Sequence, residues 1–310
     1  MTTMRDEFFN NIYEHAKIDR NIVILSADFS APSLDKFRLD LPSQYIFMGI
    51  SEQNMMLVAA GLALEGKKPI CYAIAPFATL RCFEQIKLYA SGMKLPIIIV
   101  GVGAGVAYTD SGYTHHALED IAVMRSLPHM KIFQPCDNED IRQMVEIALY
   151  SDSPIYLRLD RYGEDKLFEA THTVSDTFSV VKEKKQINLL ASGSMMKIAS
   201  RVVSELEQEN IIIGLINANI IPINSNKLKK YIEGTDILFT LEEHTLLGGI
   251  GSHVLETISD LDINVKVKRL GFNLENGYVS EFGTREEIYS YYGLDVSSIK
   301  KYIKKYVEGK

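Results

Sequence analysis

Short runs of apolar residues alternate along this chain with longer segments in which apolar residues recur every three or four positions. The short runs predict β-strands and the longer segments predict amphipathic helices. In the first half, strands are expected at residues 22–26, 45–48, 69–72, 96–100, 131–133 and 155–159. Helices are expected at 3–17, 77–90, 118–126 and 138–149, and after Ser51. This alternation predicts an α/β fold with a doubly wound, mostly parallel sheet, in which ligands bind beyond the C-terminal strand ends.

The alternation is interrupted at residues 164–182, which are polar and lack periodicity, so a linker is expected there. A second alternating unit follows the linker. Its strands are expected at 187–191, 211–216, 236–241 and 265–269, and its helices at 195–209, 225–233, 250–259 and in the tail 285–306. We therefore expect two doubly wound domains, a mostly parallel one at 1–163 and a smaller α/β one at 183–310.

One predicted helix differs from the others because it has no polar face. Ser51 is a good N-cap residue, and residues 55–64 carry no polar side chain. A helix that is apolar all round is expected to be buried all round. Glu52 lies in its first turn, where the helix dipole would favour even a solvated carboxylate. Since this helix has no wet face, we expect Glu52 to be buried, and a buried carboxylate is usually paired or functional.

Composition narrows the class of protein. The chain has 310 residues and a net charge of −7, so nothing in its charge favours nucleic acid or an anionic membrane as partner. The first residues carry no secretory pattern, and the longest apolar runs are too short to span a bilayer. The cysteines Cys71, Cys82 and Cys136 show no CxxC spacing, which predicts buried thiols and no metal site. We expect a cytoplasmic protein.

Two segments carry a resemblance to a known family. Gly49-Ile-Ser-Glu-Gln-Asn-Met55 resembles the signature of the pyrimidine-binding domain of transketolases and related thiamine-diphosphate enzymes. The resemblance implies that Glu52 hydrogen-bonds a ring nitrogen of the cofactor's aminopyrimidine. Residues 77–85 look like the family segment that carries the stacking aromatic, which makes Phe77 the candidate and assigns Arg81 and Asp28 to the same cofactor site. The alternative for Phe77 is an ordinary core aromatic.

A further segment resembles the family's substrate loop. Gly112, Thr114 and His115 match a transketolase signature in which the matching His contacts the sugar, so His115 is a candidate catalytic and substrate-binding residue. The alternative is that His115 and His116 are a helix-entry pair without a ligand. Arg158 matches a family Arg that binds substrate phosphate, with Arg161 as a near alternative.

The chain departs from the family pattern at two substrate positions. Ser111 stands where the family has an Asp that contacts an acceptor hydroxyl, and it is assigned to the substrate site. Gly103 stands where many transketolases have a phosphate-binding His. These departures predict weaker phosphate recognition. The surrounding Gly101-Val-Gly-Ala-Gly105 is read as backbone that passes close to a ligand or partner.

A missing motif predicts a partner. Family members hold the diphosphate through Mg²⁺ or Ca²⁺ on a separate domain that carries Gly-Asp-Gly and then Asn-Asn, and this sequence contains no Gly-Asp-Gly. The resemblance therefore implies the C-terminal subunit of a split transketolase, which transfers a two-carbon ketol unit from a ketose to an aldehyde. The cofactor and metal would be shared with an N-terminal subunit in an α2β2 assembly.

Two other readings stay open. One is a related thiamine subunit, similar to deoxyxylulose phosphate synthase or to the β chain of a 2-oxo acid dehydrogenase. The other is a non-catalytic structural paralogue, against which the retained Glu52 argues. In the second half, Glu242, Glu243 and His244 form a possible acid/base cluster at a strand end. Because the family's C-terminal domain carries no cofactor contacts, we expect these three to be structural or interface residues.

Overall fold

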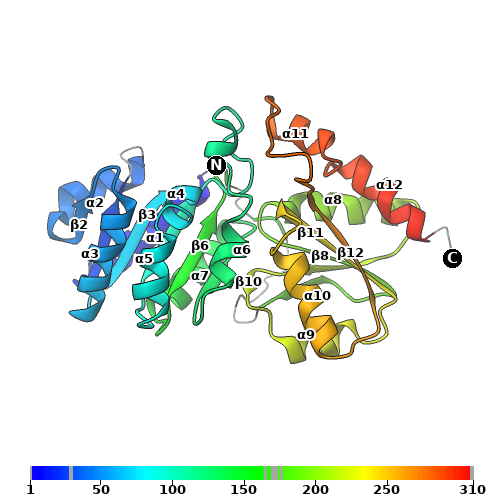
Figure 1. Cartoon of the computed structure of the whole chain (residues 1–310), viewed down its shortest axis with the longest axis horizontal. Coiled ribbons are helices and arrows are strands. Elements are labelled where there is room, and N and C mark those ends of the chain that lie inside the picture. The colour runs from blue at the N-terminus through cyan, green and yellow to red at the C-terminus, as the bar shows by residue number, and fades with distance from the viewer. Residues whose placement is uncertain (1, 28–30, 164–165, 169–173, 175–176, 308–310) are drawn as a thin grey trace.

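The computed structural model describes residues 2–27, 31–163, 166–168, 174 and 177–307. Its strands form two sheets that lie side by side along the long axis of the molecule (Figure 1). Among these residues, the first sheet has seven strands in the order β10-β5-β6-β4-β3-β1-β2, and all neighbours are parallel except β10 and β5. The predicted α/β class with two doubly wound domains is confirmed. No helix formed by the described residues is long and apolar enough to cross a bilayer.

The first half supplies almost all of the first sheet. Its strands are β1 (Ile22–Ser26), β2 (Tyr45–Phe47), β3 (Lys68–Ile74), β4 (Ile98–Val102), β5 (Lys131–Phe133) and β6 (Ile155–Leu159). Its helices are α1 (Met4–Ala16), α2 (Asp35–Asp40), α3 (Glu52–Leu64), α4 (Ala75–Thr79), α5 (Phe83–Gln85), α6 (Asp120–Arg125) and α7 (Asn138–Leu149). Shorter helical turns are η1 (Pro32–Leu34), η2 (Pro42–Gln44), the π-helical η3 (Ile86–Ser91) and η4 (Gly112–Thr114). The edge strand β10 (Ile220–Ile221) comes from the second half.

The second sheet is built the same way. In the described part of the second half it has five strands in the order β12-β11-β8-β9-β7, with only β7 antiparallel to its neighbour. The strands are β7 (Ser179–Lys182), β8 (Ile187–Ala191), β9 (Gly214–Asn217), β11 (Ile237–Thr245) and β12 (Lys266–Phe272). The helices are α8 (Met195–Gln208), α9 (Ser225–Ile232), α10 (Ile250–Asp260), α11 (Arg285–Tyr291) and α12 (Val296–Val307).

The strands bury both faces, and alternate residues enter different cores. In β1, Ile22 and Ile24 pack with α1 and α7, whereas Val23 and Leu25 pack on the side of α3. The core on the α3 side continues into the second half, where α9 and α10 contribute to it. A separate core lies between the second sheet and the helices α8, α11 and α12. The shared core fixes the two domains against each other.

Three predictions need correction. The expected helix 77–90 is broken at residues 80–82 and continues as α5 and the π-helical η3. The expected linker 164–182 is too long, because residues 179–182 already form β7. The helix after Ser51 is not buried all round, since Leu57 and Leu64 are 44% and 60% exposed. An apolar sequence cannot distinguish a core face from a face that awaits a partner.

Candidate functional site

Glu52 begins α3, and its carboxylate lies inside the protein. The residue is 3% exposed, and its Oε2 accepts a hydrogen bond from Nη1 of Arg81 over 2.8 Å. The Ser51 hydroxyl donates to the carbonyl oxygen of Met48, so it does not cap the helix by its side chain. The prediction that Glu52 is buried is confirmed, and Arg81 is its ion-pair partner. Ser51 stands at the N-cap position, as expected, but makes no capping hydrogen bond with its side chain.

Phe77 and Arg81 extend the site from Glu52. The guanidinium carbon of Arg81 lies 4.0 Å from the centroid of the Phe77 ring, close enough for a cation–π contact. Phe77 and Phe83 are both half-buried, but Phe83 packs against the core whereas Phe77 meets Arg81 and His115. This placement favours a ligand-facing role for Phe77 over the alternative of a core aromatic.

His115 reaches the same place from another segment. Its ring lies edge-on to Phe77, with 5.1 Å between centroids, and its Nδ1 is 2.9 Å from the Thr114 hydroxyl. The start of α3, the helix α4 and the loop after β4 thus bring Glu52, Phe77 and His115 together at the C-terminal ends of parallel strands. Doubly wound sheets bind their ligands at this position.

The remaining substrate candidates form an accessible rim. The Ser111 hydroxyl donates to Asp110 over 3.4 Å. The Arg161 guanidinium stacks 4.8 Å from the Tyr108 centroid, lies 3.8 Å from Asp110, and has a side chain that is 43% exposed. Tyr108 and Asp110 were not among the predicted site residues, although Tyr108 is an aromatic residue that closely follows the glycine-rich run. The substrate roles of Ser111 and Arg161 stay predictions.

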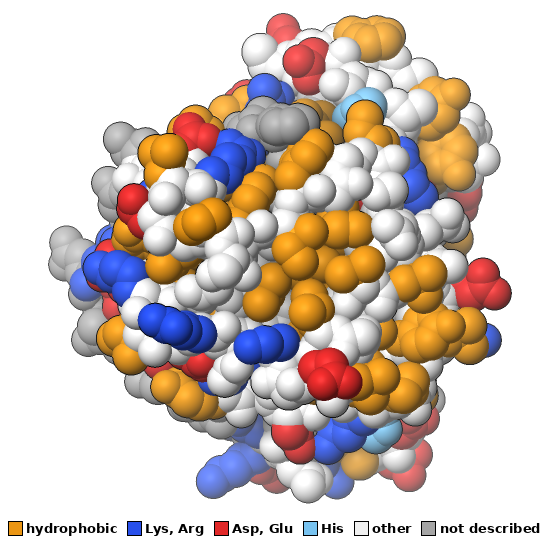
Figure 2. Space-filling view, turned by 90° about the vertical axis from the view of Figure 1, so that its left-hand side faces the viewer, with side chains coloured by type: hydrophobic (Ala, Val, Ile, Leu, Met, Phe, Trp, Pro, Cys, Tyr) orange, Lys and Arg blue, Asp and Glu red, His pale blue; other side chains and the backbone are white. Residues whose placement is uncertain are grey.

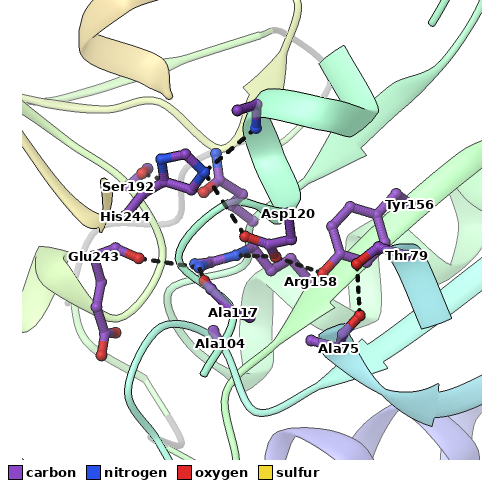
Figure 3. A network of polar contacts seen from close by, with 12 residues as sticks. Ala75, Thr79, Ala104, Ala117, Asp120, Tyr156, Arg158, Ser192, Glu243 and His244 are labelled. Carbon is purple, nitrogen blue, oxygen red and sulfur yellow. Dashed lines mark hydrogen bonds and ion pairs between the residues drawn. The ribbon is translucent and has the colours of Figure 1, made fainter. Parts of the chain in front are cut away.

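Arg158 does not lie in this rim, and its assignment to substrate phosphate needs correction. Its side chain is 3% exposed, and Nε donates to Asp120 over 2.7 Å (Figure 3). Its Nη2 donates to the carbonyl oxygens of Ala117 and Glu243 over 2.7 and 3.0 Å. Tyr156, two positions earlier on β6, donates its hydroxyl to the same Asp120. Arg158 is therefore engaged inside the protein. Asp28, also assigned from the sequence, lies outside the described residues.

The glycine-rich run at the end of β4 was expected to pass close to a ligand or partner, but the side chains that it approaches belong to the same chain. Gly103 has φ +93°, and a Cβ there would lie 2.1 Å from the Tyr108 ring. Gly105 has φ +61°, and a Cβ there would lie 2.1 Å from Cδ of Glu243. Tyr108 thus fills the space beside Gly103, the position where many transketolases carry a histidine.

The residues Glu242, Glu243 and His244 lie at the end of β11 and are buried, as expected of structural or interface groups. Glu242 accepts from the backbone N–H groups of Ile250 and Gly251 at the start of α10. Burial raises the pKa of Glu242 to about 7. Burial also lowers the pKa of His244 to about 4, so the imidazole is neutral at pH 7.

One cluster of ligand-type atoms lies away from this site. Cys136, Asp137 and Asp140 bring such atoms within 4.8 Å of one another. The carboxylates of Asp137 and Asp140 already accept hydrogen bonds from the backbone. Asp137 caps α7 by accepting from the Asp140 N–H, and Asp140 accepts from the Cys136 N–H. Burial raises the pKa of the Cys136 thiol well above its usual range, which disfavours the thiolate that a metal needs. The cluster reads as a helix cap.

Comparison with known proteins adds to this geometry. Residues 1–163 match the family model of the transketolase pyrimidine-binding domain, and residues 176–299 match that of the transketolase C-terminal domain. A subunit of the apulose-4-phosphate transketolase from Phocaeicola vulgatus is 32% identical, over 97% of this chain and 96% of that protein. A 1-deoxy-D-xylulose-5-phosphate synthase from Clostridium tetani is 31% identical, over 94% of this chain but 46% of that protein.

A solved structure matches the fold over its length. It is described as a split-gene transketolase in an inactive β4 tetramer, and it superposes with a TM-score of 0.87 at 32% identity, covering 98% of both chains. The resemblance inferred from residues 49–55, 77–85 and 112–115 is thereby confirmed. The chain belongs to the transketolase family, with the pyrimidine-binding domain in its first half and the C-terminal domain in its second.

Proposed function

We propose that this chain is the C-terminal subunit of a split, thiamine-diphosphate-dependent transketolase that is active only with a partner subunit. The observation that carries the proposal is the convergence of the buried Glu52 carboxylate with Phe77 and His115. A half-buried aromatic ring beside a buried carboxylate fits an aminopyrimidine, which needs a stacking surface and a hydrogen-bond acceptor. The reaction is the transfer of a two-carbon ketol unit from a ketose to an aldehyde.

In the proposed reaction, the residues of this chain would bind the cofactor's pyrimidine ring and contact the sugar. Glu52 would accept a hydrogen bond from the pyrimidine ring and hold a proton at that ring nitrogen, with Phe77 stacking on the ring. The low local dielectric around Glu52 strengthens such a bond. His115, at the edge of Phe77, is placed to contact the sugar. Thiamine diphosphate itself supplies the carbon nucleophile that takes up and passes on the ketol unit.

An exposed apolar face supports the need for a partner. Hydrophobic side chains gather on the side of the molecule that carries β2, α2 and α3 (Figure 2). Exposed apolar residues of β2, α3 and the segment between them are Phe47, Ile50, Leu57 and Leu64. A contiguous exposed apolar surface marks an interaction site. We infer that the partner's diphosphate domain, which holds the Mg²⁺ or Ca²⁺, covers this face and completes the cofactor site beside Glu52.

The names of two relatives also support an enzyme that is divided between two subunits. The Phocaeicola protein is named as one subunit of a transketolase, and the solved neighbour is described as an inactive tetramer of β subunits alone. We infer an assembly of two copies of this chain and two of the partner, since closed twofold assemblies are the commonest. Light scattering of the mixed subunits tests this stoichiometry, and a fully active one-to-one complex would contradict it.

Deoxyxylulose phosphate synthase chemistry is the second candidate, supported by the 31% identity to the Clostridium enzyme. Both reactions use the same half-site, so Glu52 and Phe77 do not separate them. Product analysis separates them directly. Ketol transfer consumes a ketose and an aldehyde, whereas the synthase reaction consumes a 2-oxo acid and releases CO₂.

Calorimetry and turnover test the proposal together. The chain is titrated with thiamine diphosphate and Mg²⁺, first alone and then mixed with a candidate partner that carries the Gly-Asp-Gly and Asn-Asn motif. We expect tight cofactor binding and ketol transfer only in the mixture. Full turnover by the chain alone would overturn the proposal.

A further inference from the structure

The loop that carries His115 runs from Gly103 to Ala117, and we call it the His115 loop. Its base is closed by a backbone hydrogen bond from the Ala117 N–H to the Gly105 carbonyl oxygen over 2.8 Å. The loop holds Tyr108 and His115, whose rings lie 6.1 Å apart. The groups that fix its two ends therefore decide where His115 sits relative to Phe77.

The second domain holds the first end of the loop. Glu243, at the end of β11, accepts a hydrogen bond at Oε1 from the Val106 N–H over 3.0 Å. Arg285, at the start of α11, donates from Nη2 to the Ala104 carbonyl oxygen over 3.4 Å. The absence of a side chain at Gly105 allows this approach, because a Cβ there would collide with Glu243.

The second domain also holds the other end of the loop. The Thr245 N–H donates to the Leu118 carbonyl oxygen over 2.9 Å. The buried Arg158 ties Ala117 to Glu243 by donating to both carbonyl oxygens (Figure 3). The Glu243 side chain points away from Arg158 in this view, so its backbone and its carboxylate act on different parts of the loop.

The Glu243 carboxylate is itself held firmly. Arg285 donates from Nε to Glu243 Oε1 over 2.9 Å and from Nη2 to Oε2, and the Ser194 hydroxyl donates to Oε2. Through Nη1, Arg285 also bonds both oxygens of Asp160, which follows β6 of the first domain. A bidentate guanidinium–carboxylate pair fixes direction as well as distance. The pair thus forms a rigid bridge between the two domains at the base of the loop.

From these contacts we propose that Glu243 and Arg285 are positioning residues that set the conformation of the His115 loop. The second domain, which carries none of the cofactor candidates, thereby controls the sugar-binding side of the site. The link from loop to sugar rests on the function proposed above, whereas the link from Glu243 to loop rests only on this chain.

The test compares two neighbouring glutamates. Glu243→Gln removes the charge that binds Arg285 and weakens the hold on Val106. Glu242→Gln is the matched control, because Glu242 is equally buried on the same strand but bonds the backbone of Ile250 and Gly251 instead. Hydrogen exchange is measured on each folded chain without partner or cofactor. We expect amides of 105–117 to exchange at least tenfold faster in Glu243→Gln only, and amides of 250–252 to respond in Glu242→Gln only.

Kinetics of the reconstituted complex give the second readout. We expect Glu243→Gln to raise the KM of the sugar about tenfold with the affinity for thiamine diphosphate unchanged, whereas Glu242→Gln leaves both unchanged. If Glu243→Gln does not fold, Ser194→Ala and Arg285→Lys weaken the same bridge more gently and are measured in its place. Unchanged loop exchange in the folded variants, or equal loop exchange in both glutamate variants, would overturn the proposal. Faster loop exchange in the isolated Glu243→Gln chain, together with a wild-type complex that shows no ketol transfer, would instead refute only the proposed function.

Discussion

Arg81 donates a hydrogen bond from Nη1 to Oε2 of Glu52, and this pair joins residues that are 29 positions apart in the chain. The Arg81 guanidinium also covers the ring of Phe77. It therefore presents a flat, donor-bearing group to the same carboxylate and the same ring that are proposed to hold the aminopyrimidine. The pair provides two direct tests of the site.

Glu52→Gln is expected to preserve the fold and to remove most activity of the reconstituted complex. The amide has nearly the same shape but carries no charge, so it cannot hold the proton on the pyrimidine ring. Acid–base contributions of this kind are worth roughly a hundred- to ten-thousand-fold in rate. Glu65→Gln, at the exposed C-terminal end of the same helix, is the control and should keep full activity. If the activity of Glu52→Gln stayed within a few-fold of the wild type, Glu52 would have no catalytic role and would serve only at the start of the helix.

Arg81→Gln is expected to lower the free energy of unfolding by about 1 kcal/mol, because it leaves the buried Glu52 carboxylate without its ion-pair partner. The figure is kept small since the Arg81 side chain is 40% exposed and solvent screens the pair. In the Glu52→Gln background the same change should cost less, and a double-mutant cycle measures the difference. Lys94→Gln, which breaks the exposed pair with Asp152, serves as control. Equal costs in both backgrounds would show that the two residues do not interact.

The order of elements could be predicted because apolar runs report burial directly. The strand Ile22–Ser26 was predicted to the residue, since its β-branched and apolar side chains enter a core on each face. The break at residues 80–82 could not be predicted, because apolar residues continue on both sides of it. The backbone resumes there as the short helix α5 and then changes to a π-helical turn at Ile86. Such turns frequently occur at functional sites, and this one follows Arg81.

The site could be predicted only where its residues belong to a recognisable segment. Glu52, Phe77 and His115 lie in such segments, and the structure brings them together. Arg158 also matched a family position, but its partner Asp120 is 38 positions away, and no local pattern shows that pairing. The hydrogen bond from the Val106 N–H to Glu243 joins residues 137 positions apart, so no local sequence pattern indicates it either.

Arg158 and Arg161 should respond differently to the same substitution. Arg158→Met leaves the fully buried Asp120 without its guanidinium, and breaking a buried ion pair on one side costs about 3–5 kcal/mol. Arg161→Met removes an exposed side chain and should change the free energy of unfolding by no more than about 0.5 kcal/mol. Denaturant unfolding of both variants checks the pair. A folded Arg158→Met of near wild-type stability would restore Arg158 as a candidate for substrate binding.

His244 is expected to make the protein less stable in acid. Burial lowers its pKa from the usual 6.5 to about 4, with Asp120 opposing and Arg158 adding to that effect. The unfolded chain therefore takes up a proton at a higher pH than the folded one. The stability that the neutral His244 contributes is fully present above about pH 6.5 and is lost as the pH falls toward 4. At 1.36 kcal/mol per pKa unit, this contribution is roughly 3 kcal/mol.

The His244 effect is isolated by a difference between variants, since Glu242 with its raised pKa acts in the opposite direction between about pH 4.5 and 7. Unfolding of wild type and His244→Gln is measured from pH 4 to pH 7. The advantage of the wild type should shrink as the pH falls through this range. His129→Asn is the control, because His129 is exposed and asparagine tolerates its left-handed backbone conformation. The free energy of unfolding of this variant should change with pH as that of the wild type does. A constant difference between wild type and His244→Gln would contradict the assignment.

Of the two arginines assigned to a substrate phosphate from the sequence, Arg161 is the one whose side chain is accessible. It lies over Tyr108 at the rim of the site, while Arg158 is engaged internally and Gly103 replaces a family histidine. A charge-assisted hydrogen bond contributes about 1.5–3 kcal/mol, which corresponds to roughly ten- to a hundredfold in affinity. Arg161→Met should therefore raise the KM for a phosphorylated aldose by about that factor and leave the KM for an unphosphorylated aldehyde unchanged.

Steady-state kinetics of the reconstituted complex with ribose 5-phosphate and with unphosphorylated aldehydes checks this expectation. Ser111→Ala is the companion variant, because Ser111 lies in the same rim but carries no charge. It should affect both classes of acceptor alike. A loss that is equal for both acceptors in Arg161→Met would show that Arg161 shapes the loop through Asp110 and Tyr108 and does not bind phosphate. In that event the partner subunit would have to supply the cation for any phosphorylated substrate.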